Sequence, residues 1–557
     1  MTATMRALAV TAALLIVSLP FAMATTEAQE GGVTFERLLN AADEPHNWLT
    51  YSGNYEAQRH TTLDQITPAN VDRLELQWVF QARSLQVFQT TPLVVDGMMY
   101  LTEAPNTVYA VDAEHGRVFW RYEYTPSPES RPCCGRVNRG VAILGDTLFM
   151  GTIDAQLIAI DRISGQPIWQ TAVERPEAGY ALTLAPLIVK DKVIVSVAGG
   201  EFGIRGFISA YDVETGEEVW KFYTIPGPGE PGHETWGGDS WRYGGASAWI
   251  TGSYDPDVDL IYWGIGNPGP DWNPAQRPGD NLYSDSVVAL DPDTGELDWY
   301  FQFTPNDPYD YDSVQVPVLV DFPAQDGSTL KLMLFGNRNG FFYVLNRENG
   351  QFINGQPFIE LNWAEGLDDN GRPIFIPQEP GATTYPGVQG GTNWYSPSYS
   401  PSTRLFYMSV WEGYGSVFEA EEAEYVEGRV FLGGRPAPPI PGGALPNLAR
   451  GHINTWTEEA GSGAVMAIDP ATGEQRWKYE MTDVTSSGVL TTATDVLFTG
   501  NREGYFHALD ARTGDLLWMR SLGGMIANGP ISYAIDGRQY VAVASGNGLF
   551  VYALREE

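Results

Sequence analysis

Short runs of alternating apolar and polar residues recur along the chain, and each run ends in a turn signal. Alternation with a period of two predicts β-strands that bury one face. The runs end on a string of the form apolar-x-Asp-x-x-(Thr/Ser)-Gly-x-x-x-Trp, which occurs seven times, six times with the Trp. The acidic or amide position of the string is Asp112, Asp161, Asp212, Asp291, Asn346, Asp469 and Asp510.

Each string is interpreted as a β-hairpin. The Asp and Thr side chains can bond the turn backbone, Gly supplies the positive φ, and the Trp lies on the following strand. One copy would be an ordinary hairpin turn, but seven copies indicate a repeat in which the Trp docks between neighbouring sheets.

The spacing of the strings is that of a β-propeller. The intervals are 49, 51, 79, 55, 123 and 41 residues, and a four-stranded blade takes about 40–50. The longest interval has room for a degenerate blade, with strand signals from Tyr395 to Val410, and for a Pro/Gly/Glu-rich insertion from Glu412 to Arg450. A strand near Leu74 to Phe80 is expected to close the ring. We predict an all-β, eight-bladed propeller with Trp-docking motifs.

The chain begins with a segment typical of an export signal. Arg6 supplies the positive charge, residues 7–21 are mostly apolar, and Ala22-Met23-Ala24 fits a cleavage site. An uncleaved anchor is the alternative, although the apolar run is short for a membrane span. We therefore expect a signal peptide over residues 1–24 and a single propeller domain over 25–557, exported to an oxidising compartment such as the periplasm.

Charge and cysteine content exclude several classes of function. The formal net charge is −36, from 33 basic and 69 acidic residues, which opposes binding to nucleic acid or to an anionic membrane. It suits a cationic protein partner. The only cysteines are the adjacent Cys133 and Cys134, so the sequence has neither a thiolate zinc site nor the Cys-x-x-Cys-His of a c-type haem.

Five short motifs lie outside the repeat strings. They are Cys133-Cys134-Gly135-Arg136-Val137-Asn138-Arg139-Gly140, Leu182–Pro186 with Gly199-Gly200-Glu201, Gly244–Trp249, Gly264–Pro268, and Thr304–Asp312. With these motifs in a propeller, the chain resembles the periplasmic quinoprotein alcohol dehydrogenases, which use pyrroloquinoline quinone (PQQ) and a metal ion. The resemblance extends from Asn47 to Leu554.

The resemblance implies a PQQ site. A Cys133–Cys134 disulfide ring would lie on one face of the quinone and Trp249 on the other, while Arg139 would bind a carboxylate and Arg338 would lie near the quinone oxygens. A reduced cysteine pair is the alternative, and export favours the ring. The complete set of implied PQQ contacts is Gln89, Cys133, Cys134, Arg139, Thr183, Gly199, Gly200, Ser247, Trp249, Arg338, Asn393 and Trp394.

The resemblance also implies a metal site made of Glu201, Asn267, Asp310 and Asp312, with Asp310 as the catalytic base. In extended backbone, carboxylates two residues apart face the same way, and their repulsion is costly unless a cation lies between them. An exposed acidic loop is the alternative. In the family, an Asp at the position of Asp312 is typical of lanthanide-dependent members, so a lanthanide is favoured and Ca²⁺ stays possible.

We therefore expect oxidation of a primary alcohol to an aldehyde, with electrons passed to a separate soluble cytochrome c; a homodimer is possible. Gln89 and Ser486 stand where methanol dehydrogenases carry Glu and Trp, and a long insertion of those enzymes is absent between Ala544 and Phe550. These departures favour an open site. Two alternatives are a calcium-dependent PQQ dehydrogenase for a bulkier or polymeric alcohol and a non-catalytic propeller scaffold of outer-membrane assembly.

Overall fold

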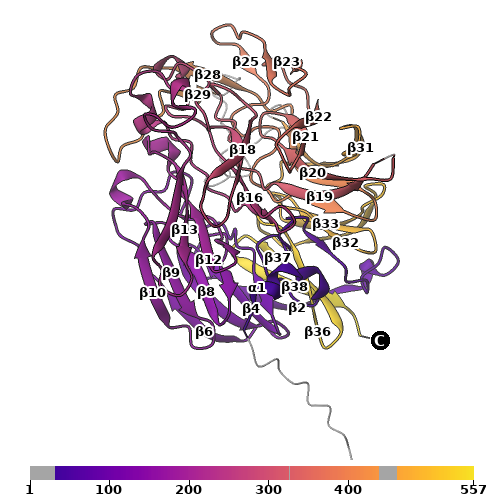
Figure 1. The fold of residues 1–557 in the computed structure, drawn as a ribbon. Helices are drawn as coiled ribbons and strands as arrows, with labels where there is room; N and C mark the ends of the chain where they lie inside the picture. Colours follow the sequence, from indigo (N-terminus) through magenta and orange to yellow (C-terminus); the bar gives the residue numbers. More distant parts are fainter. Residues whose placement is uncertain (1–31, 325, 438–460, 557) are drawn as a thin grey trace, which may run out of the picture.

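The fold is almost entirely built from β-strands. A computed structural model describes residues 32–324, 326–437 and 461–556, so the expected signal peptide lies outside the described residues. Within these ranges, eight sheets of four or five strands follow one another around the molecule (Figure 1). The fold class predicted from the repeat is thereby confirmed.

Within each of the eight sheets, hydrogen-bonded neighbours are antiparallel, except where β1 joins β32. The first four sheets are β3 (Leu93–Val95), β4 (Met98–Glu103), β5 (Thr107–Asp112), β6 (Val118–Glu123); β7 (Ala142–Leu144), β8 (Thr147–Gly151), β9 (Gln156–Asp161), β10 (Pro167–Ala172); β11 (Leu187–Val189), β12 (Lys192–Ser196), β13 (Phe207–Asp212), β14 (Glu218–Tyr223); and β15 (Ser253–Asp255), β16 (Leu260–Gly264), β17 (Ser286–Leu290), β18 (Leu297–Gln302). The next three are β19 (Val318–Pro323), β20 (Thr329–Gly336), β21 (Phe341–Asn346), β22 (Phe352–Pro357); β26 (Ser398–Ser400), β27 (Leu405–Glu412), β30 (Ser462–Ile468), β31 (Gln475–Met481); and β32 (Leu490–Thr492), β33 (Val496–Gly500), β34 (Tyr505–Asp510), β35 (Leu516–Ser521) with the short β1 (His60–Thr61).

The eighth sheet joins the two ends of the described chain. It consists of β36 (Ile531–Ile535), β37 (Arg538–Ser545), β38 (Gly548–Leu554) and β2 (Leu74–Gln81). Strand β2 pairs antiparallel with β38, with Leu74 opposite Leu554 and Phe80 opposite Leu549. The predicted closing strand is therefore confirmed.

The assignment of one blade was wrong. The strands predicted between Tyr395 and Val410 form no blade of their own: β26 and β27 share a sheet with β30 and β31, whose turn contains Asp469. The insertion lies inside this sheet, between β27 and β30, and lengthens the interval. The eighth blade is instead the closing sheet, which contains no copy of the repeat string.

In five of the six repeats that carry it, and at Trp78, a Trp packs on the turn glycine of the next repeat. A Cβ on any of these glycines would lie 2.5–2.7 Å from the indole ring, so only Gly fits there. The pairs are Trp78 with Gly116, Trp120 with Gly165, Trp169 with Gly216, Trp220 with Gly295, Trp299 with Gly350 and Trp477 with Gly514. The repeat with Phe352 in place of Trp leaves Gly473 against Gln356. Trp78, outside any string, docks the closing sheet.

Helices are few and short in the described residues. The only α-helix there is α1 (Phe35–Leu39). The remaining helical segments are 3₁₀ turns at Ala41–Asp43, Val71–Arg73, Pro176–Ala178, Gly200–Phe202, His233–Thr235, Ser240–Tyr243 and Pro274–Gln276. The described part of the chain contains no helix long and apolar enough to cross a membrane.

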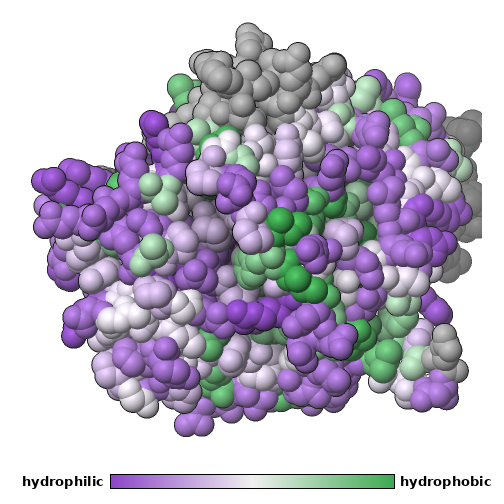
Figure 2. All heavy atoms as spheres, turned by 90° about the horizontal axis from the view of Figure 1, so that it is seen from above, coloured by the Kyte–Doolittle hydropathy of each residue, from purple (hydrophilic) through white to green (hydrophobic). Residues whose placement is uncertain are grey.

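Two small sheets lie at one end of the molecule, at the top of Figure 1. They are β23 (Ala364–Leu367) with β24 (Pro373–Phe375), and β25 (Thr383–Thr384) with β28 (Ser416–Ala420) and β29 (Gly434–Ala437). Figure 2 shows this end as a mainly hydrophilic surface with a group of apolar residues near its middle.

Candidate active site

A cavity of about 430 Å³ contains most of the residues that the sequence motifs point to. This volume lies within the range of about 300–1,000 Å³ typical of small-molecule sites. The predicted residues that line it are Gln89, Cys133, Cys134, Arg139, Thr183, Gly199, Glu201, Trp249, Asp310, Asp312, Arg338, Asn393 and Trp394. Most come from loops between sheets, and Gly199, Glu201 and Arg338 come from loops that connect strands within a sheet.

The other three predicted residues lie together behind the cavity wall. A Cβ on Gly200 would approach Ser247 Oγ to 3.2 Å and Asn267 Oδ1 to 4.0 Å. The Asn267 backbone N–H donates to Asp312 Oδ1 at 2.9 Å. The absence of a side chain at position 200 thus leaves room beside the Ser247 hydroxyl and the Asn267 side-chain oxygen.

A guanidinium without a carboxylate partner is buried in the cavity wall. Arg139 is 5% exposed and lies over the rings of Trp249 and Trp394, with Cζ 5.2 and 4.6 Å from their centroids. Its Nη1 donates to the Thr183 carbonyl at 3.2 Å, while Nε has no hydrogen-bond partner among the described residues. Burial lowers the pKa of Arg139 to about 10. An anionic ligand would relieve this cost.

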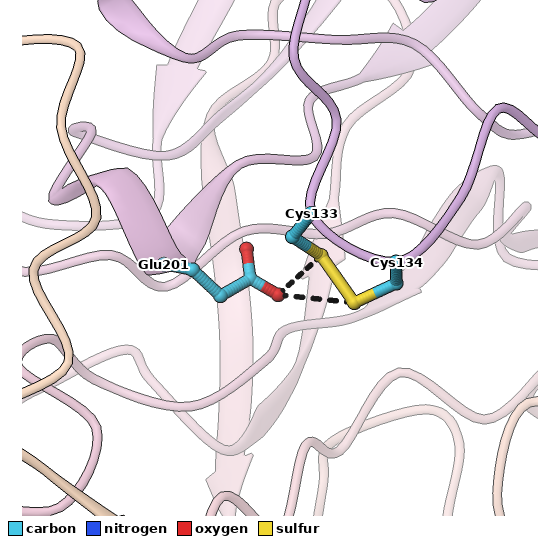
Figure 3. Close-up of side chains that lie close together, drawn as sticks. All are labelled: Cys133, Cys134 and Glu201. Atoms are coloured by element: carbon cyan, nitrogen blue, oxygen red, sulfur yellow. Dashed lines mark hydrogen bonds between the residues drawn. A yellow bond between two sulfur atoms is a disulfide. The ribbon is translucent and has the colours of Figure 1, made fainter. Parts of the chain in front are cut away.

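The adjacent cysteines form the predicted disulfide ring (Figure 3). Glu201 points at it, with Oε1 2.7 Å from Cys133 Sγ and 3.5 Å from Cys134 Sγ. A disulfide sulfur has no proton to donate, so a hydrogen bond there requires a protonated Glu201. Burial raises the pKa of Glu201 to about 7, which permits such a proton in the metal-free protein.

Asp310 and Asp312 both bind the guanidinium of Arg338. The distances are 3.1 Å from Nη2 to Asp310 Oδ2 and 2.6 Å from Nη1 to Asp312 Oδ2. The two carboxylates converge as predicted, but the reason given was wrong. Asp310 has a φ of +61°, in the left-handed region and not in extended backbone. Neither residue is exposed, so the alternative of an exposed acidic loop is wrong as well.

Three further carboxyl groups, which sequence reasoning missed, surround this pair. Asp271, Asp285 and Asp307 are at most 2% exposed, and both carboxyl oxygens of Asp285 lack a hydrogen-bond partner among the described residues. Burial, followed by repulsion from neighbouring carboxylates, raises the pKa of Asp271 and Asp285 well above the usual range. These residues lie in loops without a repeat pattern. The sequence signal that could have identified them is an acidic residue within a stretch of mostly apolar, buried residues.

The donor set fits a hard cation and a flat anion. Four buried carboxyl groups (Asp271, Asp285, Asp307 and Asp312) and two half-buried ones (Glu201 and Asp310) face two guanidinium groups among the described residues, Arg277 and Arg338. Such an excess of negative charge calls for a bound cation with a preference for oxygen ligands. Beside it, the disulfide, two indole rings and Arg139, which has no carboxylate partner among the described residues, form a wall suited to a planar, negatively charged ligand.

Comparison with known proteins agrees with this chemistry. Residues 48–357 match the family model "Glucose/ethanol/alcohol dehydrogenase, beta-propeller domain". Residues 461–555 match a model of the outer membrane protein assembly factor BamB, which is the scaffold alternative, but that match covers only the last blades.

Two curated relatives that this chain matches over most of their length are dehydrogenases. Quinoprotein alcohol dehydrogenase PedH of Pseudomonas putida is 38% identical over 95% of this chain and 90% of its own length. A lanthanide-dependent methanol dehydrogenase of Methylacidiphilum fumariolicum is 37% identical over 92% and 87%. The structure of a europium-containing methanol dehydrogenase superposes with a TM-score of 0.84 at 33% identity, covering 93% of this chain and all of the other. The chain belongs to the PQQ-dependent alcohol dehydrogenase family and is an enzyme.

Proposed function

We propose that the protein oxidises primary alcohols to aldehydes with PQQ and a lanthanide ion. The single observation that carries the proposal is the cavity, where a disulfide, two indole rings and a buried Arg139 with no carboxylate partner among the described residues adjoin an excess of carboxylates. PQQ supplies the two-electron oxidation of the alcohol carbon. All other steps fall to residues of this chain.

The proposed PQQ contacts are the predicted ones. Arg139 is the counter-ion for a PQQ carboxylate, and Gln89, whose buried Oε1 has no partner among the described residues, supplies a further polar contact. Gly199 lines the cavity and packs closely on the Gly179 carbonyl, where a Cβ would not fit. Thr183, Gly200, Ser247, Asn393 and Trp394 complete the set.

The proposed metal ligands are Glu201, Asn267, Asp310 and Asp312. Burial raises the pKa of Asp310 well above its usual range, and the opposing influence of Arg338 is smaller. A protonated Asp310 cannot accept the hydroxyl proton of an alcohol. A cation beside it would favour the carboxylate, so the base is active only in the metal-loaded site. Four oxygen ligands with three carboxylates suit a trivalent ion better than Ca²⁺.

The cavity also suits alcohols larger than methanol. Several small side chains line it, among them Ala181, Ala527 and Ser486. Turnover of a series of linear alcohols should therefore favour ethanol or longer chains over methanol, and a strict preference for methanol would contradict this assignment.

The sequence supports a proposal for the site of action and for the electron acceptor. We propose a periplasmic location, with residues 1–24 as a cleaved signal and 25–557 as the mature domain. We propose a separate cytochrome c as the electron acceptor, since both cysteines of the given sequence lie in the ring and neither is free to attach a haem. The net charge of −36 favours a basic acceptor, and rising salt should slow the transfer.

The decisive experiment is reconstitution of the purified protein with PQQ and either LaCl₃ or CaCl₂, followed by dye-linked turnover. La³⁺ should support higher activity than Ca²⁺. Asp312→Ala should abolish the La³⁺-supported activity, whereas Asp298→Ala, at an exposed position of β18, should not. Equal La³⁺-supported turnover in wild type and Asp312→Ala would refute the metal assignment.

A further inference from the structure

A segment that follows β27 of the sixth sheet, here called the strap, lies over loops of the third and fourth sheets beside the site. The strap, residues 413–437, contains β28 and β29, and its connection from residue 421 to 433 runs over the loop that follows β16. The Asn273 side chain donates to the Glu421 carbonyl at 2.9 Å. Gln276 exchanges two hydrogen bonds with the backbone of Ala423, at 2.8 and 3.0 Å.

The returning limb of the strap binds two of the three loops that carry the proposed metal ligands, those of Glu201 and Asn267. The Phe431 amide donates to the Glu201 carbonyl at 2.7 Å, and the Leu432 carbonyl accepts from the Trp272 amide at 2.9 Å. Glu201 lies in a single 3₁₀ turn, Gly200–Phe202, and Trp272 follows Asn267 closely in sequence. Two consecutive strap residues thus connect the backbone near Glu201 to the backbone near Asn267.

An aromatic cluster anchors this limb. The Phe431 ring is 3% exposed and lies edge-on to Tyr243 and Tyr425, with centroids 5.6 Å away in both cases. Tyr243 and Tyr425 stack on each other at 4.6 Å. A Cβ on Gly203 would lie only 3.0 Å from the Phe431 ring, so the turn that holds Glu201 packs directly against the cluster. Aromatic pairs of this kind contribute about 0.5–1.5 kcal/mol each.

Two neighbouring strap residues lack this aromatic anchoring. Val430, next to Phe431, is 59% exposed. The Arg175–Glu427 ion pair, 3.0 Å between Nη1 and Oε1, is exposed on both sides, and such pairs add little stability. Phe431, whose amide bonds to Glu201, is therefore the buried residue of this stretch.

We propose that Phe431 is a positioning residue for the metal site. Its buried ring fixes its amide, and the amide fixes the turn that aims the Glu201 carboxylate. The proposal rests on the proposed function, which makes Glu201 a metal ligand. Loss of a partner that orients a metal ligand typically weakens metal affinity about 10- to 100-fold.

The test is a titration of metal-free full-length protein with Tb³⁺ alone, followed by tryptophan-sensitised terbium luminescence. Phe431→Ala should weaken Tb³⁺ binding about 10- to 100-fold. Phe431→Leu, which keeps most of the buried volume, should recover most of the affinity, and Val430→Ala should bind as wild type does. Circular dichroism and thermal unfolding of the metal-free variants report on folding. Should Phe431→Ala not fold, Tyr425→Ala, which removes one side of the cluster, replaces it with the same expectation.

Glu201→Gln separates failure of this inference from failure of the proposed function. If Glu201→Gln binds Tb³⁺ weakly while folded Phe431→Ala binds as wild type does, the positioning role is refuted and the metal site stands. If wild type and Glu201→Gln bind Tb³⁺ equally, the metal assignment falls and the positioning role falls with it.

Discussion

Arg139 should destabilise the PQQ-free protein and stabilise the PQQ-bound one. Burial lowers its pKa from 12.5 to about 10, which corresponds to about 3 kcal/mol against the charged form. Its contacts with two indole rings stabilise the charged form by about 1–2 kcal/mol. Arg139→Met keeps the length of the side chain and removes the charge. We therefore expect the free energy of unfolding of the PQQ-free protein to rise by about 1–2 kcal/mol.

The same substitution should abolish most of the stabilisation by PQQ. A ligand at 100 times its Kd stabilises a protein by about 2.7 kcal/mol. Removing one member of a buried charge pair costs about 2–5 kcal/mol of binding energy, so at the same PQQ concentration the variant should gain well under 1 kcal/mol. The assay is urea unfolding followed by circular dichroism, with and without PQQ.

Arg59 provides a matched control. Burial also lowers its pKa to about 10, and it lies over Trp48 at 5.4 Å. Unlike Arg139, it bonds two backbone carbonyls, of Tyr51 at 2.9 Å and Pro530 at 2.8 Å. Arg59→Met should therefore destabilise the protein with or without PQQ and leave the PQQ shift intact. The reasoning is refuted if Arg139→Met lowers the stability of the PQQ-free protein, or if it retains the full shift.

Three further predictions concern the base, the repeat and the acid response. Asp310→Asn should remove turnover while PQQ still binds, as measured by absorbance of the bound cofactor; full turnover would place the base elsewhere. Trp477→Leu should cost about 2–4 kcal/mol of stability in urea unfolding, because its indole covers Gly514 and donates to a backbone carbonyl at 2.9 Å; a change below about 0.5 kcal/mol would contradict the docking role. Burial lowers the pKa of His507 to about 4. The contribution of neutral His507 to the free energy of unfolding is therefore complete above pH 6.5 and falls as the pH drops towards 4, by about 2 kcal/mol at pH 5. His507→Phe should flatten the dependence of the free energy of unfolding on pH in this range. An unchanged pH dependence in urea unfolding would contradict the role of His507.

The fold could be predicted because its signal is repeated. The turn string specifies strand, turn and docking residue together, and the strand near Leu74 to Phe80 was correctly expected to close the ring. The blade containing β26 and β27 was misassigned, since an insertion between paired strands has the same effect on spacing as an extra blade. Pairing between distant strands is a tertiary property that spacing does not encode.

The candidate site was predicted less completely than the fold. The resemblance named residues that the structure brings to one cavity, because those motifs are local strings. It gave no information on Asp271, Asp285 or Asp307, whose importance comes only from their neighbours in space. The backbone of Asp310 was also mispredicted, since a left-handed φ at a non-glycine residue is imposed by surrounding contacts.

The antiparallel contact between β2 and β38 couples the order of synthesis to the completion of folding. A chain synthesised from its amino end must hold β2 unpaired until its last strand has been made. During that interval the edge of β2 can pair with other molecules. Deleting β38 should thus yield aggregates, since β2 and β37 would both keep open edges.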